Sequence, residues 1–113
     1  MASRPTPLVL RPSTLFPMRT TYIVTYDISD AKRLRRVLKI CRNHGDHLQY
    51  SVFECDLAPA EKIKFETELK DAINGLEDQV LFIELGPAEG RGDRVISALG
   101  QPYIDIDAPC YVF

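Results

Sequence analysis

The sequence has little that would tie it to an oxidising compartment or to a membrane. Its three cysteines are odd in number, far apart and absent from any C-x-x-C arrangement. Neither a disulfide framework nor a thiolate zinc site is therefore indicated. The first 17 residues contain one apolar run, Leu8-Val9-Leu10, which is too short for a secretory segment or a membrane span. These absences favour a protein of the reducing cytoplasm without membrane association.

Several common catalytic motifs are also missing. The glycines from Gly86 to Gly92 lack the lysine of a P-loop, and no nucleophile elbow surrounds Ser51. The formal net charge of −2 argues against a surface that is basic everywhere. Nucleotide binding at those glycines is weakly supported, and any nucleic-acid-binding surface must be local.

The length and composition suit one compact domain. The chain has 113 residues, and 45% of them are hydrophobic, which provides a modest core for one domain rather than two. Residues 1–17 hold four of the eight prolines and are predicted to form a disordered extension. A single domain is expected over residues 18–113.

Hydrophobic periodicity predicts alternating strands and helices. The β-prone run from Thr20 to Tyr26 predicts a strand, and Ser29 or Asp30 can cap a helix that ends at His44-Gly45. A strand or tight hairpin is expected from Leu48 to Leu57. A second helix begins at Pro59, and a strand runs from Gln79 to Leu85. The helical spacing predicts these core positions: Leu34, Val37, Leu38 and Cys41 in the first helix, and Phe65, Leu69, Ala72, Ile73 and Leu76 in the second.

This order of elements predicts an α+β fold of the ferredoxin-like, βαββαβ type, with both helices on one face of an antiparallel sheet. The opposite face then needs a cover, and a second copy of the chain is the expected one, as a two-fold homodimer. The pattern between Arg94 and Leu99 fits a short helix or a strand. The β-prone run Cys110-Tyr111-Val112-Phe113 predicts an extra C-terminal strand that pairs across the dimer.

The most informative feature is a carboxylate followed by a basic helix. Asp27 ends the first predicted strand, and six basic residues and no acidic one lie between residues 31 and 45. A carboxylate can hold a hard divalent cation, and lysine and arginine side chains can hold phosphates. Arg33 and Arg36 lie one turn apart on the same side of this helix. The pattern indicates nucleic-acid chemistry. The alternatives are that the basic side chains of the helix serve solubility and that Asp27 caps the helix.

Three segments resemble the CRISPR-associated protein 2 family. They are Tyr26-Asp27-Ile28-Ser29, the helix Arg33-Leu34-Arg35-Arg36-Val37, and Gln49-Tyr50-Ser51-Val52-Phe53-Glu54. The resemblance covers about Tyr22 to Phe113, loosely after Gly86. It implies a ferredoxin-like homodimer that acts on RNA or duplex DNA with Mg²⁺ and works with the CRISPR integrase subunit.

The resemblance also implies roles for particular residues. Asp27 matches the family's metal-binding carboxylate, with Tyr26 beside it in the catalytic motif and Ser29 just beyond. Arg36 matches a basic position of the first helix, and Phe53 matches the aromatic residue of the second motif. Arg33, Arg36, Ser29 and Phe53 are accordingly expected to bind nucleic acid. A further basic position of the family falls near His47, where the histidine need not be charged at neutral pH.

Two functions from different classes remain open on the sequence. The first is a Mg²⁺-dependent endonuclease, slow or even inactive because the motif offers one carboxylate and no obvious general base. The second is a non-catalytic dimeric scaffold that grips duplex DNA and bridges integrase subunits. Only Asp27 distinguishes them, because a scaffold has no chemical need for a carboxylate beside phosphates.

Overall fold

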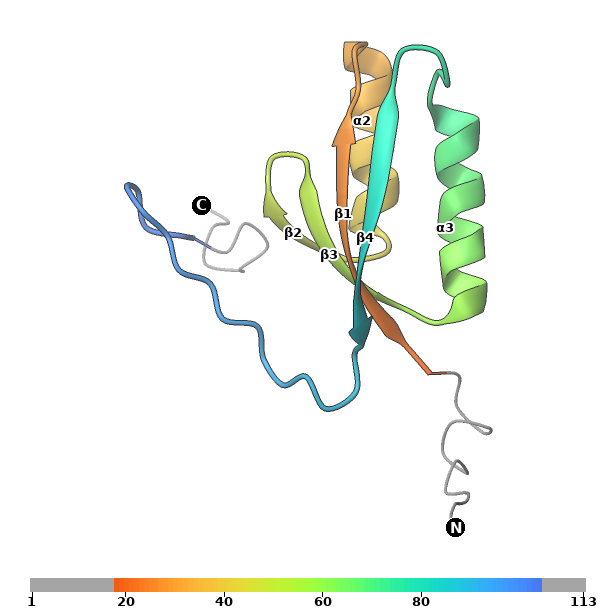
Figure 1. Cartoon of the computed structure of the whole chain (residues 1–113). Coiled ribbons are helices and arrows are strands. Elements are labelled where there is room, and N and C mark those ends of the chain that lie inside the picture. The colour runs from red at the N-terminus through yellow and green to blue at the C-terminus, as the bar shows by residue number, and fades with distance from the viewer. Residues whose placement is uncertain (1–17, 105–113) are drawn as a thin grey trace.

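The computed structural model describes residues 18–104, and they form one antiparallel sheet covered on one face by two helices (Figure 1). The elements in chain order are β1 (Thr20–Asp27), α2 (Ala31–Arg42), β2 (Asp46–Gln49), β3 (Val52–Leu57), α3 (Pro59–Ala72) and β4 (Gln79–Pro87). The strand order across the sheet is β2-β3-β1-β4. This is the predicted ferredoxin-like arrangement.

Strand β1 is the centre of the sheet because it pairs with β3 on one side and with β4 on the other. Its first residues, Thr20 and Thr21, pair with Leu57 and Asp56 of β3. At its other end, Asp27 pairs with Gln79, the first residue of β4. The carboxyl end of β1, the start of β3 and the start of β4 therefore meet at one end of the sheet.

The core lies between the sheet and the helices. It consists of side chains on alternate positions of β1 and β3 and on one side of each helix, as a period of two in strands and of 3.6 in helices requires. The buried hydrophobic members are Tyr22, Val24, Tyr26, Val37, Cys41, Phe53, Cys55, Leu57, Phe65, Leu69 and Ala72. The core predictions for Val37, Cys41, Phe65, Leu69 and Ala72 are thus confirmed, and Leu38 and Ile73 pack against this core.

Two predicted core residues lie outside it. Leu34 is 39% exposed, because the buried side of α2 begins only at Val37. Leu76 is 97% exposed. Helix α3 ends at Ala72 and its C-cap Ile73 is extended, so helical spacing no longer applies at Leu76.

The hairpin predicted within residues 48–57 is present as β2 and β3, joined by a two-residue turn at Tyr50 and Ser51. Gly45, which lies between α2 and β2, approaches β3 closely. A Cβ atom at Gly45 would overlap Cys55 Sγ and the carbonyl oxygen of Glu54. Only glycine allows this close contact between the loop after α2 and β3, because it has no Cβ atom.

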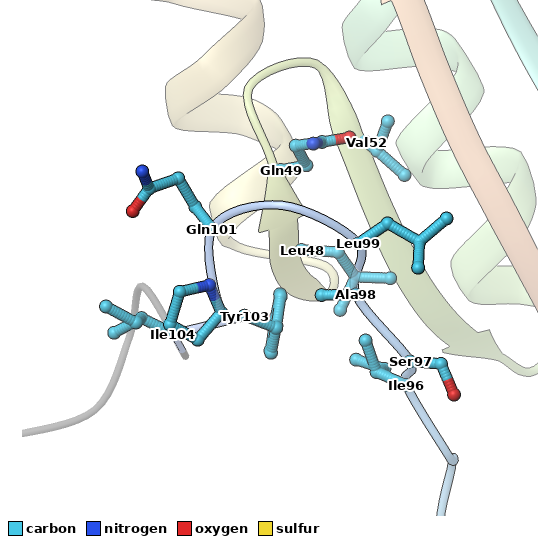
Figure 2. A pocket seen from close by; sticks show the side chains of 11 residues that line it. Leu48, Gln49, Val52, Ile96, Ser97, Ala98, Leu99, Gln101, Tyr103 and Ile104 are labelled. Carbon is cyan, nitrogen blue, oxygen red and sulfur yellow. The ribbon is translucent and has the colours of Figure 1, made fainter.

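The segment after β4 has no regular structure over residues 94–99, so neither the helix nor the strand considered there forms. Arg94 Nη1 instead donates to Asp46 Oδ2 at 3.0 Å and to Glu54 Oε1 at 3.1 Å. Beyond Arg94 the chain lines a pocket of about 710 Å³ together with the β2–β3 hairpin. Figure 2 shows Ala98 and Leu99 beside Leu48 of the hairpin. The predicted C-terminal strand at residues 110–113 and the predicted disordered extension lie outside the described residues.

The sheet face opposite the helices is partly apolar and open. Leu81, Ile83 and Leu85 of β4 are 45%, 46% and 44% exposed, and Ile83 pairs with Ile23 of β1. Exposed apolar patches of this kind often mark contact surfaces.

Candidate functional site

The site expected from the sequence lies at the end of the sheet where β1 leads into α2. Asp27 is exposed there, and no hydrogen bond or ion pair involves its side chain within residues 18–104. The helix cap is Asp30, whose Oδ2 accepts from the Arg33 N–H at 2.9 Å. Asp27 therefore does not cap α2, and the alternative that it does so is wrong.

Asp78 is the buried electrostatic centre beside this site. Its side chain has no exposed surface. Its carboxylate accepts from Arg33 Nε at 2.7 Å, from the backbone N–H groups of Asn74 at 2.8 Å and Ser29 at 3.0 Å, and from the Ser29 hydroxyl at 3.1 Å. The Arg33 guanidinium, followed by these backbone donors, holds the pKa of Asp78 well below its ordinary value of 3.8.

Arg33 and Ser29 consequently have structural partners. The Arg33 guanidinium also donates from Nη2 to Glu77 Oε1 at 3.0 Å and to Ser29 Oγ at 3.2 Å. These carboxylates raise the pKa of Arg33 above its ordinary value. The contacts tie the turn after β1 to the turn before β4. They engage Nε and Nη2 of Arg33 and the hydroxyl of Ser29 within the protein, and the expected binding of phosphates by these two residues stays a prediction.

Tyr26 and Phe53 are core residues. Tyr26 is 7% exposed and Phe53 is fully buried, with ring centroids 6.3 Å apart. The Tyr26 hydroxyl donates to the carbonyl oxygen of Tyr50 at 3.3 Å, and burial raises the pKa of its phenol above 10.0. Because strand side chains alternate, Tyr26 faces the helices while Asp27 faces the other side. Phe53, which was expected to bind nucleic acid, thus lies in the core, and the hydroxyl of Tyr26 contacts the hairpin turn.

His47 is not a surface basic residue either. It is buried, and its ring stacks on Phe53 at a centroid distance of 4.4 Å. Its Nε2 lies 2.7 Å from the carbonyl oxygen of Tyr50. The ring supports the hairpin turn rather than offering a charge to a phosphate.

The remaining basic residues of α2 are exposed. Among residues 18–104, ion pairs of α2 involve Arg33 alone. The exposed residues are Lys32, Arg35, Arg36, Lys39 and Arg42. This set, called the basic face here, offers positive charge that no acidic side chain of the described chain neutralises through an ion pair.

Comparison of the sequence with known proteins identifies its family. The sequence profile of the family described as CRISPR associated protein Cas2 matches residues 18–90. The chain belongs to the Cas2 family. A relative from Geobacter sulfurreducens, the "CRISPR-associated endoribonuclease Cas2", is 41% identical over 86 residues, which are 76% of this chain and 90% of the relative. The "CRISPR-associated endonuclease Cas2" of Halalkalibacterium halodurans is 32% identical over 77% of this chain and 94% of its own length.

Solved structures of Cas2 proteins share the fold. Streptococcus pyogenes Cas2, crystallised at pH 6.5, is 38% identical with a TM-score of 0.55, and the match covers 58% of this chain and 86% of that one. Another Cas2 crystal structure is 27% identical with a TM-score of 0.62 over 74% of this chain and 90% of that one. None of the helices within residues 18–104 is long and apolar enough to cross a membrane.

Removing the Asp78 charge should weaken folding in a pH-dependent way. A carboxyl group whose pKa is lowered on folding stabilises the folded state above its unfolded pKa, and that stabilisation disappears as the pH falls through the folded pKa. We expect Asp78→Asn to lower the free energy of unfolding at pH 7, with a smaller difference from the parent at pH 3. Urea unfolding of both proteins at the two pH values measures this. Exposed Asp71→Asn is the control, and a deficit for Asp78→Asn that grows toward pH 3 would contradict the assignment.

Proposed function

We propose that the chain is a Mg²⁺-dependent endonuclease that hydrolyses phosphodiester bonds of RNA or duplex DNA in CRISPR spacer acquisition, together with the integrase subunit. The observation that carries the proposal is the position of Asp27. It is an exposed carboxylate with no partner within residues 18–104, at the end of the central strand, and the cap of α2 is supplied by Asp30. The names of the Cas2 relatives, endoribonuclease and endonuclease, support the same chemistry.

Asp27 can supply only part of the coordination of a magnesium ion. No group of three or more His, Cys, Asp or Glu side chains within residues 18–104 is arranged to hold a metal ion. Magnesium, however, usually keeps several waters and takes one or two carboxylates plus substrate phosphate. Asp27 supplies one such carboxylate, and Asp27 of a second copy would supply another. A bound magnesium ion would lower the pKa of a water and offset charge on the phosphate.

The other residues act on the substrate through charge and position. The basic face lies on the helix that begins four residues after Asp27, so it can hold the phosphates that flank the bond to be cleaved. The Asp78 contacts fix the turn between Asp27 and α2. Tyr26 holds the hairpin turn through its hydroxyl. None of the described groups beside Asp27 is an evident general base.

The lack of an evident general base among the described residues beside Asp27 favours a second candidate function. This is a non-catalytic dimeric scaffold that grips duplex DNA and bridges integrase subunits. One carboxylate per protomer is a small catalytic set for phosphodiester hydrolysis. The basic face serves the scaffold as well as it serves the nuclease. The two functions differ in whether Asp27 is needed for more than binding.

Asp27→Asn should separate them, because asparagine keeps the size of the side chain and removes its charge. For a nuclease we expect cleavage of single-stranded RNA or duplex DNA in Mg²⁺ to fall by at least about 100-fold, with binding little changed. The matched control is Asp30→Asn, which removes a charge three residues away and preserves the helix cap. Equal cleavage by the parent and Asp27→Asn, after purification to exclude contaminating nucleases, would sink the catalytic assignment. Absence of cleavage by the parent would favour the scaffold.

Arg36→Ala tests the basic face. Removal of one phosphate-binding side chain should reduce the slope of log affinity for duplex DNA against log salt by about 0.9, without changing sequence preference. Lys64→Ala, an exposed basic residue on α3, is the control and should leave the slope unchanged. Arg33→Ala should differ from Arg36→Ala by lowering the stability of the fold, since it breaks the ion pairs with Asp78 and Glu77. A slope that is the same for the parent and Arg36→Ala would mean that Arg36 only solubilises the helix.

We further propose that the active species is a homodimer in which the open sheet face is covered. Ile83 lies on that face and is 46% exposed, so Ile83→Asp would place a charge inside the interface at a high desolvation cost. We expect this variant to shift from dimer to monomer in light scattering. Ile63→Asp is the control, because Ile63 is an exposed residue of α3, which covers the other face. Dimers of unchanged mass and affinity in Ile83→Asp would exclude this face as the interface.

A further inference from the structure

Tyr50 differs from the aromatic residues of the core in its surroundings. It occupies the tip of the β2–β3 hairpin and is 89% exposed. No hydrogen bond or ring contact involves its side chain within residues 18–104. By contrast, Tyr22, Tyr26 and Phe53 are 8% exposed or less. A free tyrosine ring offers a large apolar face with little conformational freedom to lose on binding.

The backbone beneath the ring is firmly held. The Tyr50 carbonyl oxygen accepts from the Tyr26 hydroxyl at 3.3 Å and lies 2.7 Å from His47 Nε2. The next carbonyl oxygen, that of Ser51, accepts from the Tyr26 N–H at 3.2 Å. His47 is itself stacked on buried Phe53. The hairpin tip is therefore fixed to the core, which gives the exposed ring a defined location.

That location is at the end of the sheet that carries Asp27. Thr25 pairs with Val52 in the ladder between β1 and β3, and the Tyr26 N–H to Ser51 contact continues this register. Tyr50 precedes Ser51 in the turn, beyond the last pair of this ladder, and Asp27 follows Tyr26 on β1. On the other side of Asp27, the paired residue is Gln79 of β4. Gln79 and the hairpin tip that carries Tyr50 thus lie at the same end of the sheet as Asp27.

We infer that Tyr50 is a stacking surface for an unpaired base next to the phosphate held at Asp27. The inference rests on the proposed function and deepens it by naming the residue that contacts a base of the substrate. A base within a continuous duplex has both faces covered by its neighbours, whereas an unpaired base can place one face on the tyrosine ring. Stacking of this kind tolerates any base, because each has an aromatic face.

The test is a binding measurement without cleavage, in EDTA, by fluorescence anisotropy. The proteins are the parent, Tyr50→Ala, Tyr50→Phe and Arg36→Ala. The probes are a labelled single-stranded oligonucleotide, the same strand with abasic positions, and the corresponding duplex. Thermal unfolding and light scattering are run on each variant, and an exposed side chain such as Tyr50 should be replaceable without loss of folding.

We expect Tyr50→Ala to bind the single strand about tenfold more weakly than the parent, and Tyr50→Phe to bind it as the parent does. The difference between the parent and Tyr50→Ala should disappear on the abasic strand and on the duplex. The salt slope should be unchanged by Tyr50→Ala and reduced by Arg36→Ala. This combination identifies a base contact rather than a phosphate contact.

Other outcomes overturn the inference in distinguishable ways. Equal binding of the single strand by the parent and Tyr50→Ala removes the stacking role and leaves the proposed function intact. Equal weakening on all three probes would show a general contact rather than stacking on a base. A change in molecular mass without a change in affinity would assign Tyr50 to a protein interface. A parent that binds none of the probes in EDTA would overturn this inference, since stacking and the phosphate contacts of the basic face need no metal, and the Mg²⁺ cleavage assay would still decide the proposed function.

Discussion

A buried carboxylate must be paired, because an isolated charge without water or hydrogen-bond donors is strongly unfavourable. Asp78 meets this requirement with the Arg33 guanidinium, the Ser29 hydroxyl and backbone N–H groups at Asn74 and Ser29. These donors come from the turn after β1, from α2 and from the loop between α3 and β4. The residue after Asp78 is Gln79, which pairs with Asp27 in the sheet. The position of the candidate metal-binding carboxylate thus depends on a buried one nearby.

The same requirement divides the basic residues of α2 into two groups. Arg33 stabilises the fold, since its charge neutralises Asp78 and Glu77. The residues of the basic face point to solvent and have no acidic partner in the described chain. The number of basic residues in α2 therefore overstates the positive charge available to phosphates. Glu77 and Asp78, just before β4, neutralise Arg33.

The sequence predicted the fold well because its periodicities are local. The strand at 20–26, a helix cap at Ser29 or Asp30 and the start of α3 at Pro59 all follow from short patterns that tertiary contacts did not override, and Asp30 proved to be the cap. The partner of Arg33 was not predicted, because Asp78 lies 45 residues away and no local pattern links the two. The exposure of Tyr50 does not follow from periodicity either, because strand alternation ends at the turn and says nothing about the direction of its side chain. Phe53 shows the reverse error, since a residue that matches a functional motif proved to be buried in the core.

The two deficits of the isolated chain have a common remedy. One is chemical: for the magnesium ion proposed at Asp27 the chain supplies one carboxylate, and magnesium can use two. The other is physical, since Leu81, Ile83 and Leu85 leave apolar surface in contact with water. Alternation along β1 puts Asp27 on the same face as Ile23, which pairs with Ile83. A second copy packed on this face would cover the apolar side chains and bring its own Asp27 to the same side of the sheet. Burial of hydrophobic surface would then supply the free energy that opposes repulsion between two carboxylates, and a shared cation would remove that repulsion.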